Sequence, residues 1–181
     1  MNRTWVPVFF IIGAALLGGC GKASKNGTSG EGNAPVGSAI PTKAQPKLAT
    51  IKLWIGPEEM STEMALTEIQ ERTGMMFRTN MEEGEGMIFV FPTPQRADFW
   101  MMNTILPLSA AYIDPDGQIL EIHDLQPHDT NSVAAATDNI QYVLETRQGW
   151  FKRHNIKEGT VIATERGTLR KTFLGDNQAL K

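Results

Sequence analysis

The stretch GMIFVF, residues 86–91, is an unbroken apolar run that is followed by Pro92. A strand in the interior of a sheet reads as a continuous apolar run, because neighbouring elements cover both of its faces. Pro92 cannot donate a backbone hydrogen bond, so it is expected to end such a strand. The run therefore predicts a central strand over residues 86–91, around which the rest of a sheet is built.

Further short strands are predicted on both sides of this run, each bounded by turn residues. Gly56-Pro57 breaks the first of them, and Asp114-Pro115-Asp116-Gly117 is a turn signal between two others, because Pro presets φ and Gly permits a positive φ. Many short strands with few helices are typical of a jelly-roll-like sandwich or a partly closed barrel, so the predicted fold is mainly β. The predicted strands are residues 49–55, 62–66, 97–101, 108–113, 118–122, 140–145 and 159–164.

Two short helices complete the predicted domain. In residues 67–72, Thr67 can cap the helix N-terminus, Gln70 lies three residues on as in a capping box, and Gly74 can close the C-terminal end. The second helix is expected over residues 148–154, QGWFKRH. Both are too short to change the fold class.

The chain divides into four parts by composition. Residues 1–19 are predicted to be a signal peptide, and residues 20–47 a flexible tether rich in Gly, Ser, Pro and Lys. Residues 48–166 are predicted to form a single β-rich domain, because about 120 residues suit one hydrophobic core. Residues 167–181 are expected to be a C-terminal tail that is partly disordered.

The first twenty residues carry the pattern of an export signal. Arg3 supplies a positive charge, and the apolar stretch Trp5 to Leu17 is too short for a membrane-spanning helix. Leu17-Gly18-Gly19-Cys20 then resembles the lipobox of bacterial lipoproteins, in which the cysteine thiol accepts a lipid. The alternative is an ordinary signal peptide that ends near a cysteine.

A lipobox cysteine predicts where the protein resides. We expect lipidation at Cys20, a membrane anchor made by that lipid, and a place in the cell envelope. Gly21, rather than Asp, follows the cysteine, which in a diderm organism favours the outer membrane, with the domain facing the periplasm.

Charge and cysteine content restrict the functions that remain. Cys20 is the only cysteine, so the exported domain has neither an internal disulfide nor a catalytic thiol. The formal net charge is −3, and removal of Arg3 with the signal peptide would make it −4. This mild acidity argues against nucleic acid as a partner. We expect a monomeric domain that needs no cofactor and that binds an envelope ligand or protein of unknown identity.

Five motifs follow one another through the predicted domain: GMMFR (74–78), GMIFVF (86–91), FWMMNTILPL (99–108), IDPDG (113–117), and YVLE (142–145) with Gly149. Together they resemble the bacterial and archaeal family called domain of unknown function 192. The resemblance covers the chain from about Glu63 to Val161, nearly the whole predicted domain. It implies a small, mainly β, jelly-roll-like fold that is often exported and has no established biochemical activity.

Three positions depart from the usual pattern of that family. Met102 stands where the family usually has Lys, and Ser109 and Thr160 stand where it usually has Asp. If Lys and Asp form an ion pair or a reactive site in the relatives, this chain has lost both charges together. The departures therefore suggest that both members of an ion pair have been lost, so that neither charge is left unpaired. They weaken an enzymatic interpretation.

Trp100, Asn103 and Thr104 are the first candidates for a site, because an amide and a hydroxyl interrupt an otherwise apolar stretch. They line a ligand pocket in one interpretation. In the other, Asn103 is a buried amide that satisfies backbone groups at a bend before Pro107. The second is favoured, since polar residues at bends are common and pockets are few.

Arg78 and Glu145 are the remaining candidates, and each ends an apolar motif. A guanidinium and a carboxylate in such settings often pair, so we expect a structural ion pair between them. The alternative is that they bind an anionic ligand and that Glu145 acts as an acid.

Metal ligands are a third possibility. HDLQPHD (123–129) holds two His and two Asp, but Pro127 indicates an extended loop and the spacing matches no common zinc motif. Eight of the nine Met lie between Met60 and Met102, and thioethers can bind Cu(I), although Met more often fills a core.

Three functions remain open from the sequence. The first is a lipid-anchored envelope protein whose β-domain binds a ligand or partner without catalysis. The second is an envelope enzyme of the hydrolase or transferase type, with a site near Trp100, Asn103 and Glu145 and with Asp114 or His123 as further candidate acids or bases. The third is a metal handler that uses Met and His. No metal site is predicted, because neither the Met nor the His residues have the spacing of a known metal-binding motif.

Overall fold

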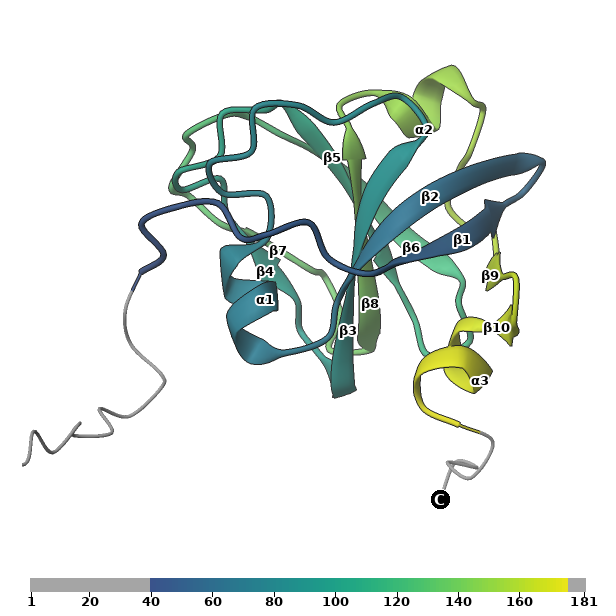
Figure 1. Ribbon diagram of the computed structural model, residues 1–181. Coiled ribbons are helices and arrows are strands. Elements are labelled where there is room, and N and C mark those ends of the chain that lie inside the picture. The colour runs from purple at the N-terminus through teal and green to yellow at the C-terminus, as the bar shows by residue number, and fades with distance from the viewer. Residues whose placement is uncertain (1–39, 176–181) are drawn as a thin grey trace, which may run out of the picture. The chain divides into compact units, whose positions relative to one another are not determined.

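The strands determine the architecture of this computed structural model, which describes residues 40–175 (Figure 1). The predicted signal peptide, the predicted lipidation site at Cys20 and most of the predicted tether lie outside the described residues. Eight strands form one mixed sheet in the order β10-β9-β1-β2-β3-β8-β5-β6, and β4 pairs with β7 in a separate ribbon. The strands of the large sheet are β1 (Thr50–Ile55), β2 (Glu58–Ala65), β3 (Glu85–Gln95), β5 (Leu108–Ile113), β6 (Ile119–Leu125), β8 (Ile140–Arg147), β9 (Ile162–Thr164) and β10 (Gly167–Thr168).

The predicted fold class is confirmed: the described chain is mainly β and sandwich-like, and its large sheet is not closed into a barrel. The end strand β6 nevertheless comes close to β9, the strand next to the other end, where an isolated antiparallel bridge joins Gln118 to Val161. Beside this bridge the N–H of Ile119 donates to the carbonyl of Thr160 over 2.9 Å. The sheet is therefore strongly bent but open.

β3 is a central strand, as the run at 86–91 predicts, with β2 parallel on one side and β8 antiparallel on the other. The predicted end at Pro92 is wrong, because β3 runs on to Gln95. The pairing with β8 shifts register between Val90 and Gln95, and residues 92–95 are exposed. A proline is tolerated at such an irregularity, where a ladder hydrogen bond is already missing.

Two hairpins are formed at the predicted breaks. Gly56 adopts φ +60 between β1 and β2. Between β5 and β6, the Asp114 side chain accepts hydrogen bonds from the N–H groups of Asp116 and Gln118, both over 2.9 Å, and Gly117 adopts φ +87. The turns therefore form as these residue types predict: Gly56 and Gly117 adopt a positive φ, and the Asp114 side chain accepts hydrogen bonds from the backbone of the turn.

The first predicted helix is present as α1 (Glu68–Thr73), and its capping box has formed between Thr67 and Gln70. α1 connects the parallel strands β2 and β3. The second predicted helix is shorter than expected, as α2 (Trp150–Arg153). The predicted strand over residues 97–101 is also shorter: β4 (Asp98–Phe99) pairs with β7 (Val133–Ala134), and the chain then leaves the ribbon.

A third helix, α3 (Leu169–Phe173), lies in the segment that was expected to be a partly disordered tail. Leu169 is completely buried and Phe173 packs against the core, so the folded domain continues past Arg166. One helical turn is too short to show a helical period in the sequence, which explains the wrong boundary.

The folded part also begins slightly before residue 48. The side-chain amide of Gln45 donates to the carbonyls of Gln70 and Gly74, over 3.2 and 2.9 Å. The carbonyl of Pro46 accepts a hydrogen bond from Arg78 over 3.2 Å. The last residues of the predicted tether are therefore attached to the domain.

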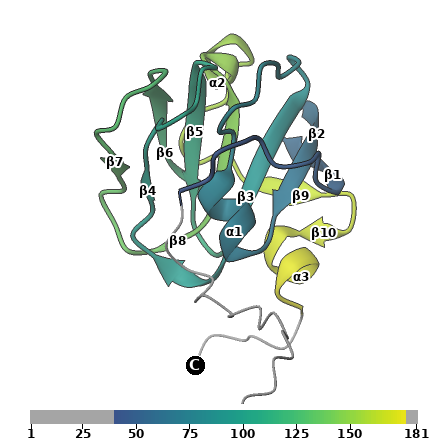
Figure 2. The same cartoon turned by 60° about the vertical axis from the view of Figure 1, so that its left-hand side comes forward.

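The large sheet has a buried apolar cluster on each of its faces. Figure 2 shows α1 beside β3, on one side of the sheet. We call one apolar cluster the hairpin-side core, which contains Leu53 and Ile88. We call the other the α1-side core, which contains Met87 and Phe89. Neighbouring residues of β3 thus point to opposite cores, which is why its sequence does not alternate.

No helix within residues 40–175 is long and apolar enough to cross a membrane.

Candidate functional site

A cavity of about 240 Å³ opens in the α1-side core, between α1, β3, β4 and the segment after β4. This volume is below the range of roughly 300–1,000 Å³ for pockets that hold drug-sized ligands, so the cavity suits a smaller molecule. The large apolar side chains of its wall are Met75, Met76, Phe89, Phe91, Phe99 and Trp100. Trp100 alone of these six was a candidate from the sequence, and the other five come from three separate segments.

Glu145 is the buried polar group of this cavity. It lies on β8, opposite Met87 of β3 and Ala110 of β5, and only 4 % of its surface is exposed. Its Oε2 atom has no hydrogen-bond partner among the described residues. Burial raises the pKa of Glu145 to about 8, because a charged carboxylate loses its hydration there. At neutral pH the carboxyl group therefore carries its proton and can donate a hydrogen bond.

Thr104 and Trp100 reach the same cavity from the loop after β4. Thr104 is buried and its hydroxyl donates to the carbonyl of Met102 over 3.3 Å. Trp100 is 42 % exposed, as expected of a residue at an opening. Three of the five sequence candidates, Trp100, Thr104 and Glu145, are thus brought together.

Asn103 is not in the wall of the cavity, and it is half-buried rather than buried. The expectation of a buried structural amide is therefore wrong about burial. Asn103 acts through its backbone: it adopts φ +56, and its carbonyl accepts a hydrogen bond from the N–H of Phe77 over 2.8 Å. Asn tolerates this left-handed conformation better than most residues, which explains its place in the loop.

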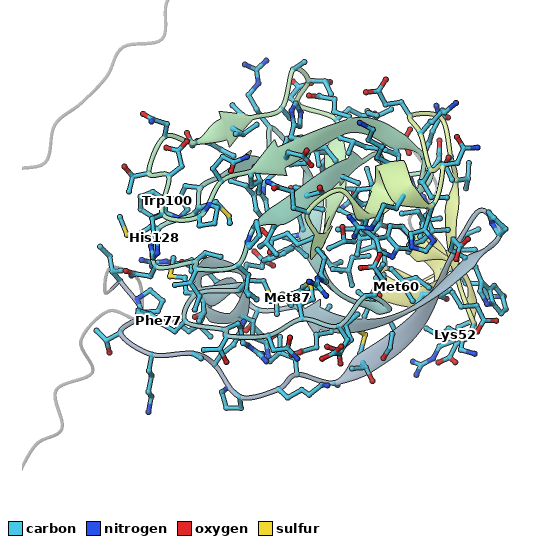
Figure 3. The ribbon with its side chains drawn as sticks, turned by 90° about the horizontal axis from the view of Figure 1, so that it is seen from above. Lys52, Met60, Phe77, Met87, Trp100 and His128 are labelled. Atoms are coloured by element: carbon cyan, nitrogen blue, oxygen red, sulfur yellow. The ribbon has the colours of Figure 1, made fainter. Side chains whose placement is uncertain are left out.

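Three non-glycine residues with positive φ surround this loop: Phe77 at 61°, Asn103 at 56° and His128 at 62°. Besides the bond between Phe77 and Asn103, the N–H of His128 donates to the carbonyl of Thr104 over 3.0 Å. Figure 3 shows Phe77, Trp100 and His128 at the end of the sheet opposite Lys52. Left-handed non-glycine residues are strained and cluster at functional sites, so this arrangement supports the cavity as a site.

Arg78 does not pair with Glu145, contrary to the predicted ion pair. Its guanidinium lies 2.9 Å from Glu63 on β2, with both side chains largely buried. Glu63 also accepts a hydrogen bond from the N–H of Leu48 over 2.6 Å. Arg78 and Glu63 therefore attach the entering chain to the sheet, and Glu145 has no salt-bridge partner within residues 40–175.

The charged groups near the cavity opening are mostly acidic. Glu71, Arg72 and Asp98 line it, and Arg72 lies 3.9 Å from Glu68. Burial, and then the charge of Glu68, raise the pKa of Glu71.

Tyr112 lies in the α1-side core but does not line the cavity. Burial, and then the charge of Glu145, raise the pKa of Tyr112, whose hydroxyl donates to the carbonyl of Val133.

His123 and His154 do not line the cavity. His123 is part of β6, not of the predicted extended loop, and its Nε2 lies 2.9 Å from Glu121. His154 lies between Glu58 and Glu83, at 3.2 and 3.4 Å. Within residues 40–175 no three His, Cys, Asp or Glu side chains are grouped as metal ligands.

Most of the methionines are buried in the interior of the domain, where Met usually serves as a filler. Six of the eight between Met60 and Met102 are buried, and Met64 and Met102 are half-buried. Flexible thioether side chains fit the irregular space around the cavity.

Ser109, Thr160 and Met102, the residues that the resemblance marks as unusual, have the following places in the structure. The Ser109 hydroxyl donates to Asp124 on β6 and accepts from the N–H of Gly149 over 2.8 Å, so it joins β5, β6 and the start of α2. Thr160 lies beside the bridge between Gln118 and Val161. Met102 is half-buried beside the cavity loop.

The solved structures that are similar to this chain include the following two. One is a candidate transcription regulator from Sinorhizobium meliloti, with 28% identity and a TM-score of 0.62 over 67% of this chain and 98% of that one. The other is a protein of unknown function from Novosphingobium aromaticivorans, with 31% identity and a TM-score of 0.62 over 66% of this chain and 89% of that one.

No curated protein matches the chain. A family model described as "DUF192: Uncharacterized ACR" matches residues 51–164, which include every wall of the cavity. The match covers more than half of the sequence and most of the described domain. The chain therefore belongs to the DUF192 family.

Proposed function

We propose that this protein is a lipid-anchored envelope protein whose β-domain binds a small ligand in the cavity beside α1, without catalysis. One observation carries the proposal: Glu145 is buried in an aromatic-walled cavity, with an oxygen atom that lacks a partner among the described residues. Leaving a buried polar group unsatisfied costs about 1–3 kcal/mol, so a ligand that supplies the missing hydrogen bond gains that interaction.

The polar groups of the cavity favour binding over nucleophilic chemistry. The wall contributes two hydroxyl groups, and both donate to backbone carbonyls: Thr73 to Ile69 over 2.7 Å, and Thr104 to Met102. A nucleophile needs a base within hydrogen-bond reach, and these hydroxyls are already engaged. Few polar groups in a mainly apolar concavity are typical of sites that orient a ligand.

A second candidate function rests on the raised pKa of Glu145. A carboxyl group that titrates at about 8 is suited to act as a general acid near neutral pH. In that case Glu145→Gln would abolish turnover of a bound substrate while binding persisted. Loss of binding itself in Glu145→Gln would instead support a purely binding role.

The anchor is proposed from the sequence. Arg3, the apolar stretch and Leu17-Gly18-Gly19-Cys20 follow one another as they do in bacterial lipoproteins. A tether that reaches about residue 45 would hold the domain away from the membrane surface, so that the opening at Trp100 meets soluble molecules.

The ligand site can be tested by NMR with isotope-labelled methionine methyl groups. Met75 and Met76 line the cavity, and Met60 lies in the hairpin-side core and serves as the internal control. A library of small organic fragments should include compounds that shift the Met75 and Met76 signals in a saturable manner and leave Met60 unchanged. Absence of any such compound would overturn the proposal.

A further inference from the structure

We propose that the ligand of this cavity is a small organic cation: a primary amine with a compact aromatic or branched apolar body. This inference rests on the proposed function of the cavity as a ligand site. The aromatic wall, the charge at the opening and the buried carboxyl group of Glu145 each favour this class of ligand.

The wall selects an apolar body and favours a positive charge near it. Phe89 and Phe99 meet edge to face with ring centroids 4.9 Å apart, and Phe91 and Trp100 add two further rings to the lining. The faces of aromatic rings attract cations, more strongly where water is excluded. An amine whose carbon body contacts these rings would gain both apolar burial and this attraction.

The ionisable groups at the cavity discriminate against anions. The lining contains three carboxyl groups, Glu71, Asp98 and Glu145, and one guanidinium group. That guanidinium, on Arg72, already lies near Glu68. Even with Glu145 neutral, the carboxyl groups of Glu71 and Asp98 would oppose an anionic ligand, whereas a cation would meet complementary charge.

Glu145 is placed to be the counter-ion. Its Oε2 is buried and unpartnered among the described residues, and an ammonium group offers three donors. The charged groups that share the cavity lining with Glu145 are Glu71 and Arg72 of α1 and Asp98 of β4. Tyr112 of β5 lies close enough to Glu145 for its charge to raise the pKa of Tyr112. Arg72, the one cation among these groups, is engaged with Glu68, and burial alone accounts for the raised pKa of Glu145, so the ammonium of the ligand would supply a positive charge that Glu145 lacks among the described residues.

Binding then exchanges a proton for a ligand. Below its pKa Glu145 is a neutral acid, and formation of the ammonium–carboxylate pair releases that proton to solvent while the amine stays protonated. The affinity for an amine should consequently rise up to tenfold per pH unit as Glu145 ionises, and become constant above about pH 8. A neutral ligand that accepts a hydrogen bond from the protonated carboxyl group would show no such rise.

The test compares benzylamine with benzyl alcohol, which has a similar shape and no charge. Dissociation constants are measured from the Met75 and Met76 methyl signals, with Met60 as control, between about pH 6 and pH 8. We expect benzylamine to bind more tightly as pH rises, with proton release seen by calorimetry in two buffers, and benzyl alcohol to bind independently of pH.

Two variants give the comparison a control within the chain. Glu145→Gln keeps the shape of the side chain and should remove both the pH dependence and the preference for the amine. Asp98→Asn changes an exposed carboxyl group at the opening and should weaken benzylamine only a few fold, with the pH dependence retained. An unchanged preference in Glu145→Gln would overturn the proposal.

The outcomes separate this inference from the proposed function. If benzyl alcohol binds in the cavity as tightly as benzylamine at every pH, the cavity is a ligand site and the amine assignment is wrong. If neither probe nor any fragment shifts the Met75 and Met76 signals, the ligand site itself is wrong, and the assignment of a class is wrong with it.

Discussion

Phe77 and Asn103 lie far apart in the sequence, yet both adopt left-handed backbone conformations, and the N–H of Phe77 donates to the carbonyl of Asn103 over 2.8 Å. Each conformation is unfavourable for its own residue, and each is held by a segment that borders the cavity. The position of the loop after β4 therefore depends on backbone geometry more than on the side chain of Asn103.

Substitutions of Asn103 should separate backbone from side-chain effects. Asn103→Ala should lower the free energy of unfolding by about 1 kcal/mol, because Ala pays more than Asn for a left-handed conformation. Asn103→Gly should remain within about 0.5 kcal/mol of the wild type, since Gly adopts this conformation freely. Chemical denaturation measures both. If the Gly variant lost as much stability as the Ala variant, the amide would be needed after all.

The buried carboxyl group of Glu145 should make stability depend on pH. Between the unfolded value of 4.5 and the folded value of about 8, the folded protein holds a proton that the unfolded chain has released. The stability of the wild type therefore falls as pH rises through this window, by up to about 1.4 kcal/mol per pH unit, and is constant above it. The Glu145→Gln variant has no carboxyl group to titrate at this position. Its free energy of unfolding, relative to that of the wild type, should therefore increase from pH 4.5 to about 8.

The measurement is urea unfolding at a series of pH values. Glu158→Gln, at an exposed position, is the matched control and should follow the wild type throughout. A difference between wild type and Glu145→Gln that stayed constant with pH would show that Glu145 has the same pKa in the folded and unfolded states.

Gly86 lies where two strands and a core residue approach closely. A Cβ atom there would lie 2.7 Å from the sulfur of Met60 and 3.0 Å from the carbonyl oxygen of Glu145. Gly86→Ala should therefore destabilise the domain by about 1–3 kcal/mol through overpacking. Gly84→Ala is the control, because a Cβ at Gly84 meets nothing within 4 Å. Thermal unfolding of both variants checks the prediction, and equal melting temperatures would contradict it.

The helix after Arg166 should contribute to the stability of the domain. Leu169 is completely buried in the hairpin-side core, so Leu169→Ala should cost about 2–5 kcal/mol. Lys171→Ala, on the exposed side of the same helix, should change stability little. If Leu169→Ala unfolded at the wild-type denaturant concentration, α3 would be peripheral, as the sequence had suggested.

Cys20 is the proposed lipid attachment site. Cys20→Ser should abolish incorporation of radiolabelled palmitate in cells and should leave the precursor unprocessed, because the thiol is the group that accepts the lipid. Gel fluorography of the wild type and the variant measures this directly. Equal labelling of the two proteins would remove the lipoprotein assignment, without consequence for the cavity.

The parts of the fold that depend on local chemistry could be predicted from the sequence. The central strand β3, the capping box at Thr67 and the turn at Asp114 all follow from neighbouring residues. The helix at Leu169 could not be found, because its single turn has no readable period and its burial depends on the distant hairpin-side core.

The cavity was only partly predictable for a similar reason. Trp100 and Thr104 could be selected because polar residues interrupt their apolar stretch, and Glu145 because it ends an apolar motif; all three line the cavity. The partner of Arg78 was misassigned because Arg78 and Glu145 reach different parts of the molecule, and sequence spacing does not show that Glu63 lies nearer. The aromatic wall could not be recognised, since its rings come from segments that read as ordinary core.

The place of β8 in the sheet has a consequence for how the chain acquires its structure. The strands that precede it form two groups, β1-β2-β3 and β5-β6, and these are joined only through β8, which comes late in the sequence. A growing chain that ends before Ile140 therefore lacks the centre of its own sheet. Folding must wait for distant contacts, which makes it slow compared with folds built from local ones. Until residues 140–147 have been synthesised, the nascent polypeptide should remain unfolded and accessible to chaperones.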